Sequence, residues 1–263
     1  KGTFDGQTVR QALPFRRTIG DNADLSATQS GNYNRLLNDQ HSLTVGWDLE
    51  WRQRDEKRDI TENGLPLVAE FEGQPFSARI QRQAFFVQDE WEINKQWSTY
   101  LGLRAEQIAS KSQGLANPIS NTSNVVTPMV HLNYKFDAAG RDLVRASVTR
   151  SYKAPDLSAL MARPFINNLF SDTSKTNTEL SPDRMGNPTL LAELAIGLVV
   201  ALEKYLPAGG LISIGVFYRQ VDDLIRNVTS LQNVDWSGVP RWVSRPVNFS
   251  KAMTRGLELE DKG

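Results

Sequence analysis

The sequence contains no cysteine and only two histidines among its 263 residues. The absence of cysteine excludes disulfide bonds, thiolate metal sites and cysteine nucleophiles. Thirty basic and thirty acidic residues balance each other, so the composition gives no sign of a nucleic-acid partner. A transmembrane helix would need about 18 to 20 consecutive apolar residues. The nearest approach, residues 189–202, is interrupted by Glu193, so we expect no such helix.

Motifs for enzymatic or metal chemistry are also missing. There is no HExxH or CxxC pair, no acidic calcium loop, no GxSxG elbow and no phosphate-cradling glycine loop. We therefore expect no catalytic residue, no bound metal and no cofactor. His41 beside a turn and His131 in a strand are too few for a metal site. A Ser–His–acid group built on His131 is an alternative, but a polar residue lining a wall is the simpler interpretation.

What the sequence does contain is a repeated alternation of apolar and polar residues. One side of residues 97–106 carries Trp97, Thr99, Leu101, Leu103 and Ala105. Residues 41–54 repeat the pattern with Leu43, Val45, Trp47, Leu49 and Trp51. Period-two alternation indicates a strand with one apolar and one polar face. A spanning strand needs only about 9 to 11 residues, half of which face a wet lumen, so a barrel in lipid can be as polar as a soluble protein.

We predict nine strands, at residues 26–37, 41–54, 78–93, 97–108, 125–136, 142–152, 190–205, 210–226 and 244–260, and one more within 1–17. The segment 190–205 is ambiguous, because its Leu, Ala, Glu and Lys content favours a helix. As a strand it has an unbroken apolar face from Ala192 to Leu202, and Gly197 disfavours a helix. Its neighbours lead us to predict a strand.

The connections between these strands alternate between short and long. Residues 38–40, 94–96, 137–141 and 207–210 are short and rich in turn formers, whereas 55–77, 109–124, 153–189 and 227–243 are long and polar. Aromatic residues cluster beside the short turns: Trp91, Trp97, Tyr134, Phe136 and Tyr205. Tight turns at one end, long loops at the other and interfacial aromatics are typical of outer-membrane barrels. A soluble β-sandwich, with these aromatics in its core, is the alternative.

Several segments together resemble the C-terminal barrel of TonB-dependent outer-membrane receptors. They are residues 86–91 (FVQDEW), 100–106 (YLGLRAE), 148–157 (VTRSYKAPDL), 186–193 (GNPTLLAE), 215–225 (GVFYRQVDDLI) and 248–260 (NFSKAMTRGLELE). The positions that carry this signature are Tyr152, Pro155, Asn187, Pro188, Glu193, Gly256 and Glu258. Pro155 follows a strand and would fix the angle at which the chain leaves it.

The resemblance implies an all-β fold, a partial transmembrane antiparallel β-barrel that supplies about nine or ten strands of a presumed twenty-two. Residues 1–263 would be one fragment of the barrel domain, truncated at both ends, without the plug domain and the closing strands. It also implies a place in the bacterial outer membrane, contact with lipid, energy from TonB delivered through the absent plug, and active uptake of a scarce nutrient such as a ferric siderophore. A passive porin-like channel and an outer-membrane barrel enzyme are the alternatives.

Candidate ligand contacts follow from charge and aromaticity. Arg104, Arg145 and Arg219 fall on predicted lumen faces, and Trp236 and Trp242 lie in a predicted long loop. Lys135, Phe165 and Phe170 have similar positions. An anionic iron chelate would be attracted to the cations and would stack on the aromatic rings. The competing interpretation is a solvated wall, in which these cations pair with Asp48, Glu50 and Glu106.

Overall fold

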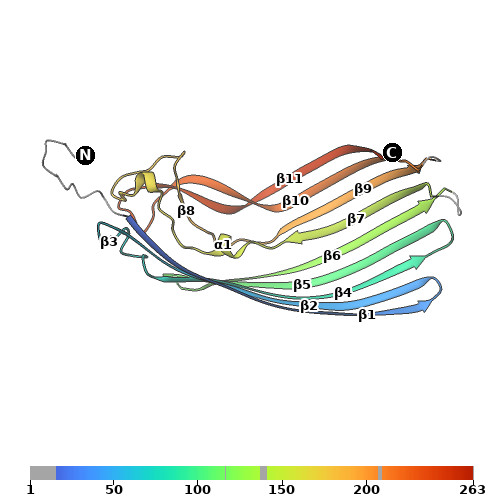
Figure 1. Ribbon diagram of the computed structural model, residues 1–263, viewed down its shortest axis with the longest axis horizontal. Helices are drawn as coiled ribbons and strands as arrows, with labels where there is room; N and C mark the ends of the chain where they lie inside the picture. Colours follow the sequence, from blue (N-terminus) through green and yellow to red (C-terminus); the bar gives the residue numbers. More distant parts are fainter. Residues whose placement is uncertain (1–15, 116, 137–140, 207–208, 263) are drawn as a thin grey trace, which may run out of the picture.

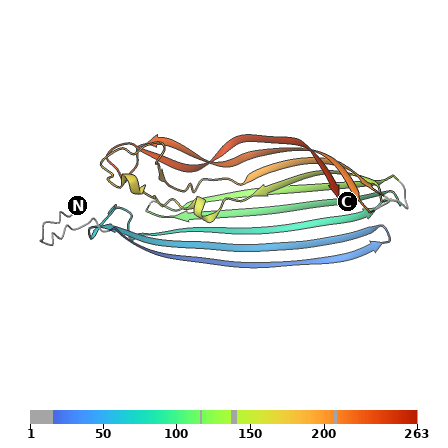
Figure 2. The same ribbon diagram turned by 45° about the horizontal axis from the view of Figure 1, so that its top comes forward.

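The computed structural model describes residues 16–115, 117–136, 141–206 and 209–262, which form one curved sheet (Figures 1 and 2). The strands are β1 (Arg16–Asn38), β2 (His41–Glu62), β3 (Leu65–Pro66), β4 (Pro75–Glu92), β5 (Trp97–Gln113), β6 (Ile119–Lys135), β7 (Leu143–Lys153), β8 (Asp183–Arg184), β9 (Glu193–Tyr205), β10 (Leu211–Gln232) and β11 (Arg241–Lys262). A one-turn helix α1 (Leu157–Leu160) and a 3-10 turn η1 (Asn168–Phe170) lie between β7 and β8. None of the described helices is long and apolar enough to cross a membrane.

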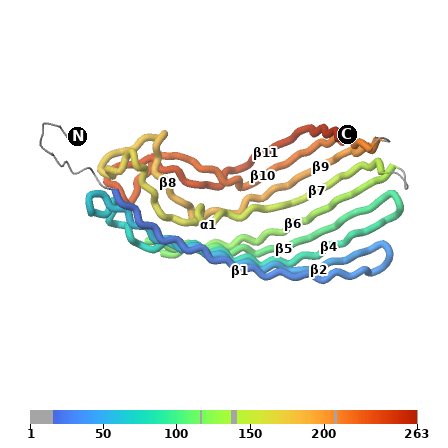
Figure 3. Tube along the Cα trace, in the orientation of Figure 1, coloured from blue at the N-terminus to red at the C-terminus, as the bar shows by residue number. Residues whose placement is uncertain are grey.

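Sequence neighbours are also neighbours in the sheet. The order is β1-β2-β4-β5-β6-β7-β9-β10-β11-β8, antiparallel throughout except that β8 pairs parallel with β11, and β3 pairs with β2. β1 lies at one edge and β8, beside β11, at the other, so the described sheet is open (Figure 3). This confirms an all-β, partial antiparallel barrel. The ambiguous segment 190–205 forms strand β9, and the strand proposed within residues 1–17 falls almost wholly outside the described residues.

The nine predicted strands are present, and most of them, though not β9, extend further than predicted at the ends away from the short turns. Residues 55–62, 109–113, 119–124 and 227–232 were expected in long loops and instead extend β2, β5, β6 and β10. The expectation of four long loops was therefore wrong for three of them. Only the connection from β7 to β9 is long, and it includes α1, η1 and β8. Polar pairs across strands help to hold the extensions, such as Gln107 Nε2 to Asn124 Oδ1 at 3.2 Å.

One face of the sheet carries a continuous apolar band. Leu101, Val130, Val148 and Leu198 lie side by side on four neighbouring strands. All four side chains are exposed, since no protein layer covers this face. On β5 the band runs from Trp97 to Ala105 and is followed by Gln107, which matches the length that a tilted spanning strand needs.

Aromatic rings line the band beside the short turns. Trp97 and Tyr134 have ring centroids 4.5 Å apart, and Tyr134 and Phe136 are 5.6 Å apart. Asp89 interrupts the apolar alternation, and its Oδ2 lies 2.7 Å from the Nδ1 of His41. The pair compensates a polar group that would otherwise lie alone among apolar side chains.

The opposite, concave face is filled at its far end by the β7–β9 connection (Figure 1). Inward residues of the extended strands, such as Ile80, Ile108 and Val125, pack against Leu160 and Ile166 of this connection. The other members of this core are Val68, Phe71, Phe76, Ala78, Met161, Leu190, Ala192, Trp236 and Val243. The far ends of these strands therefore bury a folded connection, which the sequence periodicity does not reveal.

Candidate functional site

A cavity of about 750 Å³ lies between the β7–β9 connection and the far ends of three strands. Its walls come from β2, α1 and the residues after it, the flank of β8, β10 and β11. Three guanidinium groups line it, those of Arg58, Arg163 and Arg184, together with the Phe165 ring and the carboxylates of Glu56 and Asp156. The arrangement combines concentrated positive charge with an aromatic surface.

Arg163 ties the connection to the turn that precedes β4. Its side chain is only 3% exposed, and its Nη2 donates to Glu72 Oε2 at 3.2 Å and to the Arg58 carbonyl at 2.9 Å. Nε and Nη1 have no hydrogen-bond partner among the described residues, although Nη1 forms an ion pair with Glu56 Oε1 at 3.7 Å. Burial lowers the pKa of Arg163 and raises the pKa of Glu72, whose carboxylate also accepts the Ile60 N–H at 2.8 Å. This wall of the cavity therefore holds a buried and incompletely satisfied cation.

The charges of Arg58 and Arg184 are less compensated by carboxylates than the charge of Arg163 is. The Arg58 guanidinium lies 4.8 Å from the centre of the Phe165 ring and donates to the Pro164 carbonyl at 3.5 Å. Desolvation lowers its pKa. Phe165 and Arg184 exchange two backbone hydrogen bonds, of 2.7 and 2.9 Å, which fix this part of the connection while the Arg184 side chain stays exposed. In the described residues neither guanidinium forms an ion pair.

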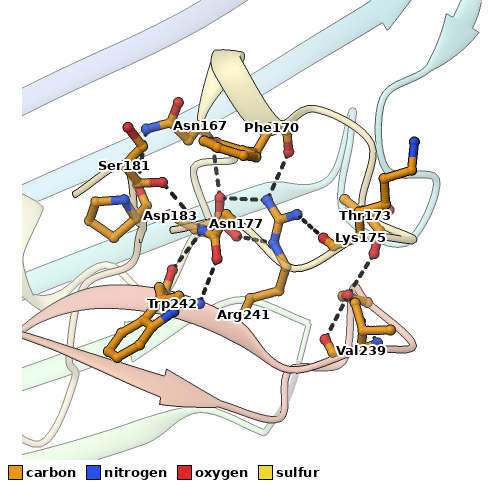
Figure 4. A network of polar contacts seen from close by, with 12 residues as sticks. Asn167, Phe170, Thr173, Lys175, Asn177, Ser181, Asp183, Val239, Arg241 and Trp242 are labelled. Atoms are coloured by element: carbon orange, nitrogen blue, oxygen red, sulfur yellow. Dashed lines mark hydrogen bonds and ion pairs between the residues drawn. The ribbon is translucent and has the colours of Figure 1, made fainter. Parts of the chain in front are cut away.

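A buried ion pair fixes the outer half of the connection to β11 (Figure 4). Both Arg241 and Asp183 have no exposed surface, and the guanidinium donates to both carboxylate oxygens at 2.9 and 3.0 Å. Its other donors reach the carbonyls of Phe170, Asp172 and Lys175 at 2.6 to 3.3 Å. All five N–H donors of the arginine are used. A buried ion pair is stable only when its hydrogen-bonding groups all have partners, and the Arg241 guanidinium meets this condition.

Asn177 adds a second attachment in the same region. It accepts the Trp242 N–H at 2.6 Å and donates to the Trp242 carbonyl at 2.9 Å, as an extra strand would (Figure 4). Near α1, Gly186 allows a close backbone approach, because a Cβ there would lie 2.1 Å from the Met161 carbonyl oxygen. The shape of the cavity is thus set by packing and hydrogen bonds.

The model of the TonB dependent receptor-like β-barrel family matches residues 2–263. The chain belongs to this family. Among solved structures, it is similar to the ferric citrate transporter FecA in its unliganded form (TM-score 0.61, 15% identity, covering 94% of this chain and 33% of that one). It is also similar to the copper transporter OprC (TM-score 0.61, 14% identity, covering 93% of this chain and 36% of that one). A third similar structure is the ferric yersiniabactin uptake receptor FyuA from Yersinia pestis (TM-score 0.58, 13% identity, covering 94% of this chain and 33% of that one).

These solved structures are receptors and transporters, and at such low identity they show the fold alone. No curated protein matches the sequence. The chain spans about a third of the length of the solved structures it matches.

Several signature positions of the receptor barrel have visible structural roles. Asn187 donates from Nδ2 to the Pro246 carbonyl at 3.0 Å, and its Oδ1 accepts the N–H of Thr189 at 3.0 Å. Glu193 accepts the Ile225 N–H at 2.8 Å, at the point where β9 begins. Tyr152 forms hydrogen bonds with Glu106 and Arg82, and Pro155 is buried. Pro188 follows Asn187 in the turn. On β11, Gly256 leaves room for the Phe217 ring and Glu258 is exposed.

The five predicted ligand contacts of the receptor are not brought together. Arg104 is neutralised by Asp48 and Glu106, each 2.5 Å away. Arg145 pairs with Glu203 at 3.1 Å near the short turns, while Arg219 is exposed on the concave face.

The two tryptophans of this set also lie apart. Trp236 is 8% exposed and its ring edge meets Phe71, whereas Trp242 lies on β11 and is bound through its backbone. Their roles in binding stay predictions. The arginines of the cavity were missed, because only the folded connection gathers them; the Arg-Pro-Phe run at 163–165 was the one local signal.

Neither His41 nor His131 lines the arginine cavity. His131 makes an edge contact with Tyr100, with ring centroids 5.8 Å apart, and His41 stacks on Trp91. Across the described residues no three His, Asp or Glu side chains gather as a metal site would require.

Proposed function

We propose that this chain is the barrel wall and loop region of an outer-membrane receptor that imports a scarce nutrient by TonB-dependent active transport, with an anionic iron chelate of the siderophore type as cargo. The observation that carries the proposal is the cavity lined by Arg58, Arg163 and Arg184. In this proposal TonB acts through a plug domain N-terminal to the chain, and residues 1–263 are one piece of the barrel domain.

The orientation follows from the apolar band. Its exposed leucine and valine side chains would lie in the hydrocarbon of the membrane, with the rings of Trp97 and Tyr134 at one interface. The short turns would then face the periplasm, and the extended strands with the arginine cavity would project outside the cell. A cavity at that end is where cargo arrives first.

The chemistry of the cavity favours an anion with some aromatic character. Arginine donates paired hydrogen bonds to carboxylates, and a guanidinium stacked on a ring, as Arg58 is on Phe165, retains donors for a ligand. Glu56 and Asp156 compensate part of the charge. A neutral or cationic chelate would leave the cations of the cavity desolvated without a partner, which is unfavourable.

Copper is a second candidate cargo, because the thioethers of Met161 and Met185 also line the cavity and soft ligands select Cu(I). Three neighbouring guanidinium groups oppose a bare cation, so we favour the chelate.

The test is uptake of radioactive iron by cells that lack their own receptors and express the full-length protein. We expect uptake from anionic chelates only when TonB is present, and a half-saturation concentration raised about tenfold or more by the double variant R58A/R184A. R219A is the comparison, since Arg219 is exposed on the concave face outside the cavity, and it should change little. Uptake without TonB would instead indicate a porin. Uptake of copper without uptake of iron would identify copper as the cargo. An effect confined to R219A would place the binding site on the concave wall and not in the cavity.

A further inference from the structure

A second and smaller cavity, of about 200 Å³, lies at the tips of the extended strands. It is separated from the arginine cavity by Met185, which lines both. Its walls are mostly apolar and include three aromatic side chains, those of Phe71, Phe76 and Trp236. Nothing in the proposed uptake of an anion uses it.

The charges around this cavity have the opposite sign to those of its neighbour. Glu70 and Asp235 line it, and both residues are exposed. In the part of the chain that the structure describes, neither carboxylate has a hydrogen bond or an ion pair. No lysine, arginine or histidine is among the lining residues.

The interior of the cavity does not suit a charge. Arg163 already lies over the far side of this wall, 5.8 Å from the centre of the Phe71 ring and 5.7 Å from that of Phe76, so a second cation deep inside would be repelled. The carboxylates, by contrast, are exposed and therefore mark the mouth. A ligand that fits both conditions carries an apolar group inward and a positive charge outward.

We propose that this cavity binds a small organic cation, a primary ammonium that bears an aromatic or branched apolar group. The apolar group occupies the space beside Trp236 and Phe71, and the ammonium lies at the mouth between Glu70 and Asp235. Hydrogen bonds from an ammonium to carboxylates are about twice as strong as neutral ones, so the charge supplies selectivity while the apolar walls supply contact area. The site is independent of the cargo proposed above.

The experiment uses three probes with one skeleton: 2-phenylethylamine, the neutral 2-phenylethanol and the anionic phenylacetate. Full-length protein labelled with 5-fluorotryptophan is placed in lipid nanodiscs, and the fluorine resonance of Trp236 is identified by its loss in W236F. We expect the amine to shift this resonance in a saturable way, at a concentration about tenfold below that of the alcohol, with phenylacetate weakest.

The variant E70Q/D235N removes both charges at nearly constant size and lies on the surface, so folding is not at risk. It should bring the amine to the affinity of the alcohol and leave the alcohol unchanged, while E179Q, an exposed acid outside the cavity, should change neither. The proposal is overturned if no probe shifts the Trp236 resonance, if amine and alcohol bind equally, or if E70Q/D235N binds the amine as the parent does.

Discussion

Removing the guanidinium of Arg241 should release the outer half of the β7–β9 connection. The variant R241A leaves the Asp183 carboxylate without exposed surface and without its cation, and three backbone carbonyls lose their donors (Figure 4). Breaking a buried pair by removing one partner costs about 3–5 kcal/mol. Since about 1.4 kcal/mol corresponds to a factor of ten, local opening should become about one hundred to several thousand times more frequent.

The assay is hydrogen exchange followed by mass spectrometry on peptides that cover residues 167–184, because exchange reports local opening even when the barrel stays folded. Amides of β5 and β6 in the same sample serve as the internal reference and should keep their protection. R184A removes an exposed arginine from the residue next to Asp183 and is the matched control. If R241A and R184A gave the same exchange in 167–184, the connection would not depend on the ion pair, and the account of its anchoring would be wrong.

Three further predictions follow from the geometry. V148R places a charge on the apolar band and should cost about 2–4 kcal/mol in denaturant unfolding from lipid vesicles, whereas S147R, at the same height on the other face, should cost little. G186A forces a Cβ against the Met161 carbonyl and should destabilise the connection by about 1–3 kcal/mol, measured by exchange. Burial raises the pKa of Glu72, so its contribution to stability is fully present below its ordinary value of 4.5 and is lost as pH rises through the raised value. Protection of residues 67–74 against hydrogen exchange should therefore increase on acidification. The variant E72Q should abolish that pH dependence.

The sequence predicted the strands well where one face meets an apolar environment. Leu101 and Val148 alternate with polar neighbours because lipid-facing and lumen-facing positions alternate along each spanning strand. Beyond the band both faces of β2 are polar, as in the run from Arg52 to Arg58, so the period-two signal disappears although the strand continues. Hydrogen bonding across the sheet, and not side-chain pattern, extends these strands, and for this reason three predicted loops were too long.

The site could not be predicted in the same way. Arg58 and Arg163 are more than a hundred residues apart in sequence, and only the packing of the β7–β9 connection brings them to one cavity. That packing depends on a buried ion pair, Asp183 with Arg241, whose partners have no local pattern that distinguishes them from surface charges. The family signature at Gly186 and Asn187 marks where the connection is held, not what the cavity binds.

For the proposed anionic cargo, the contrast between wall and cavity indicates where binding would begin. On the concave wall the arginines of β4 and β5 are already paired: Arg82 contacts Glu50 at 2.8 Å and Glu106 at 3.3 Å, and Arg104 contacts Asp48 and Glu106 at 2.5 Å each. Such a network has little net field, so an anion gains little there and would have to break existing bonds. In the cavity, Arg58 and Arg184 form no ion pair among the described residues, so an anion that binds them needs no such exchange. Under the proposed function, capture of a negatively charged cargo would therefore begin in the cavity of the folded connection, and the paired arginines of β4 and β5 would let the cargo pass without holding it.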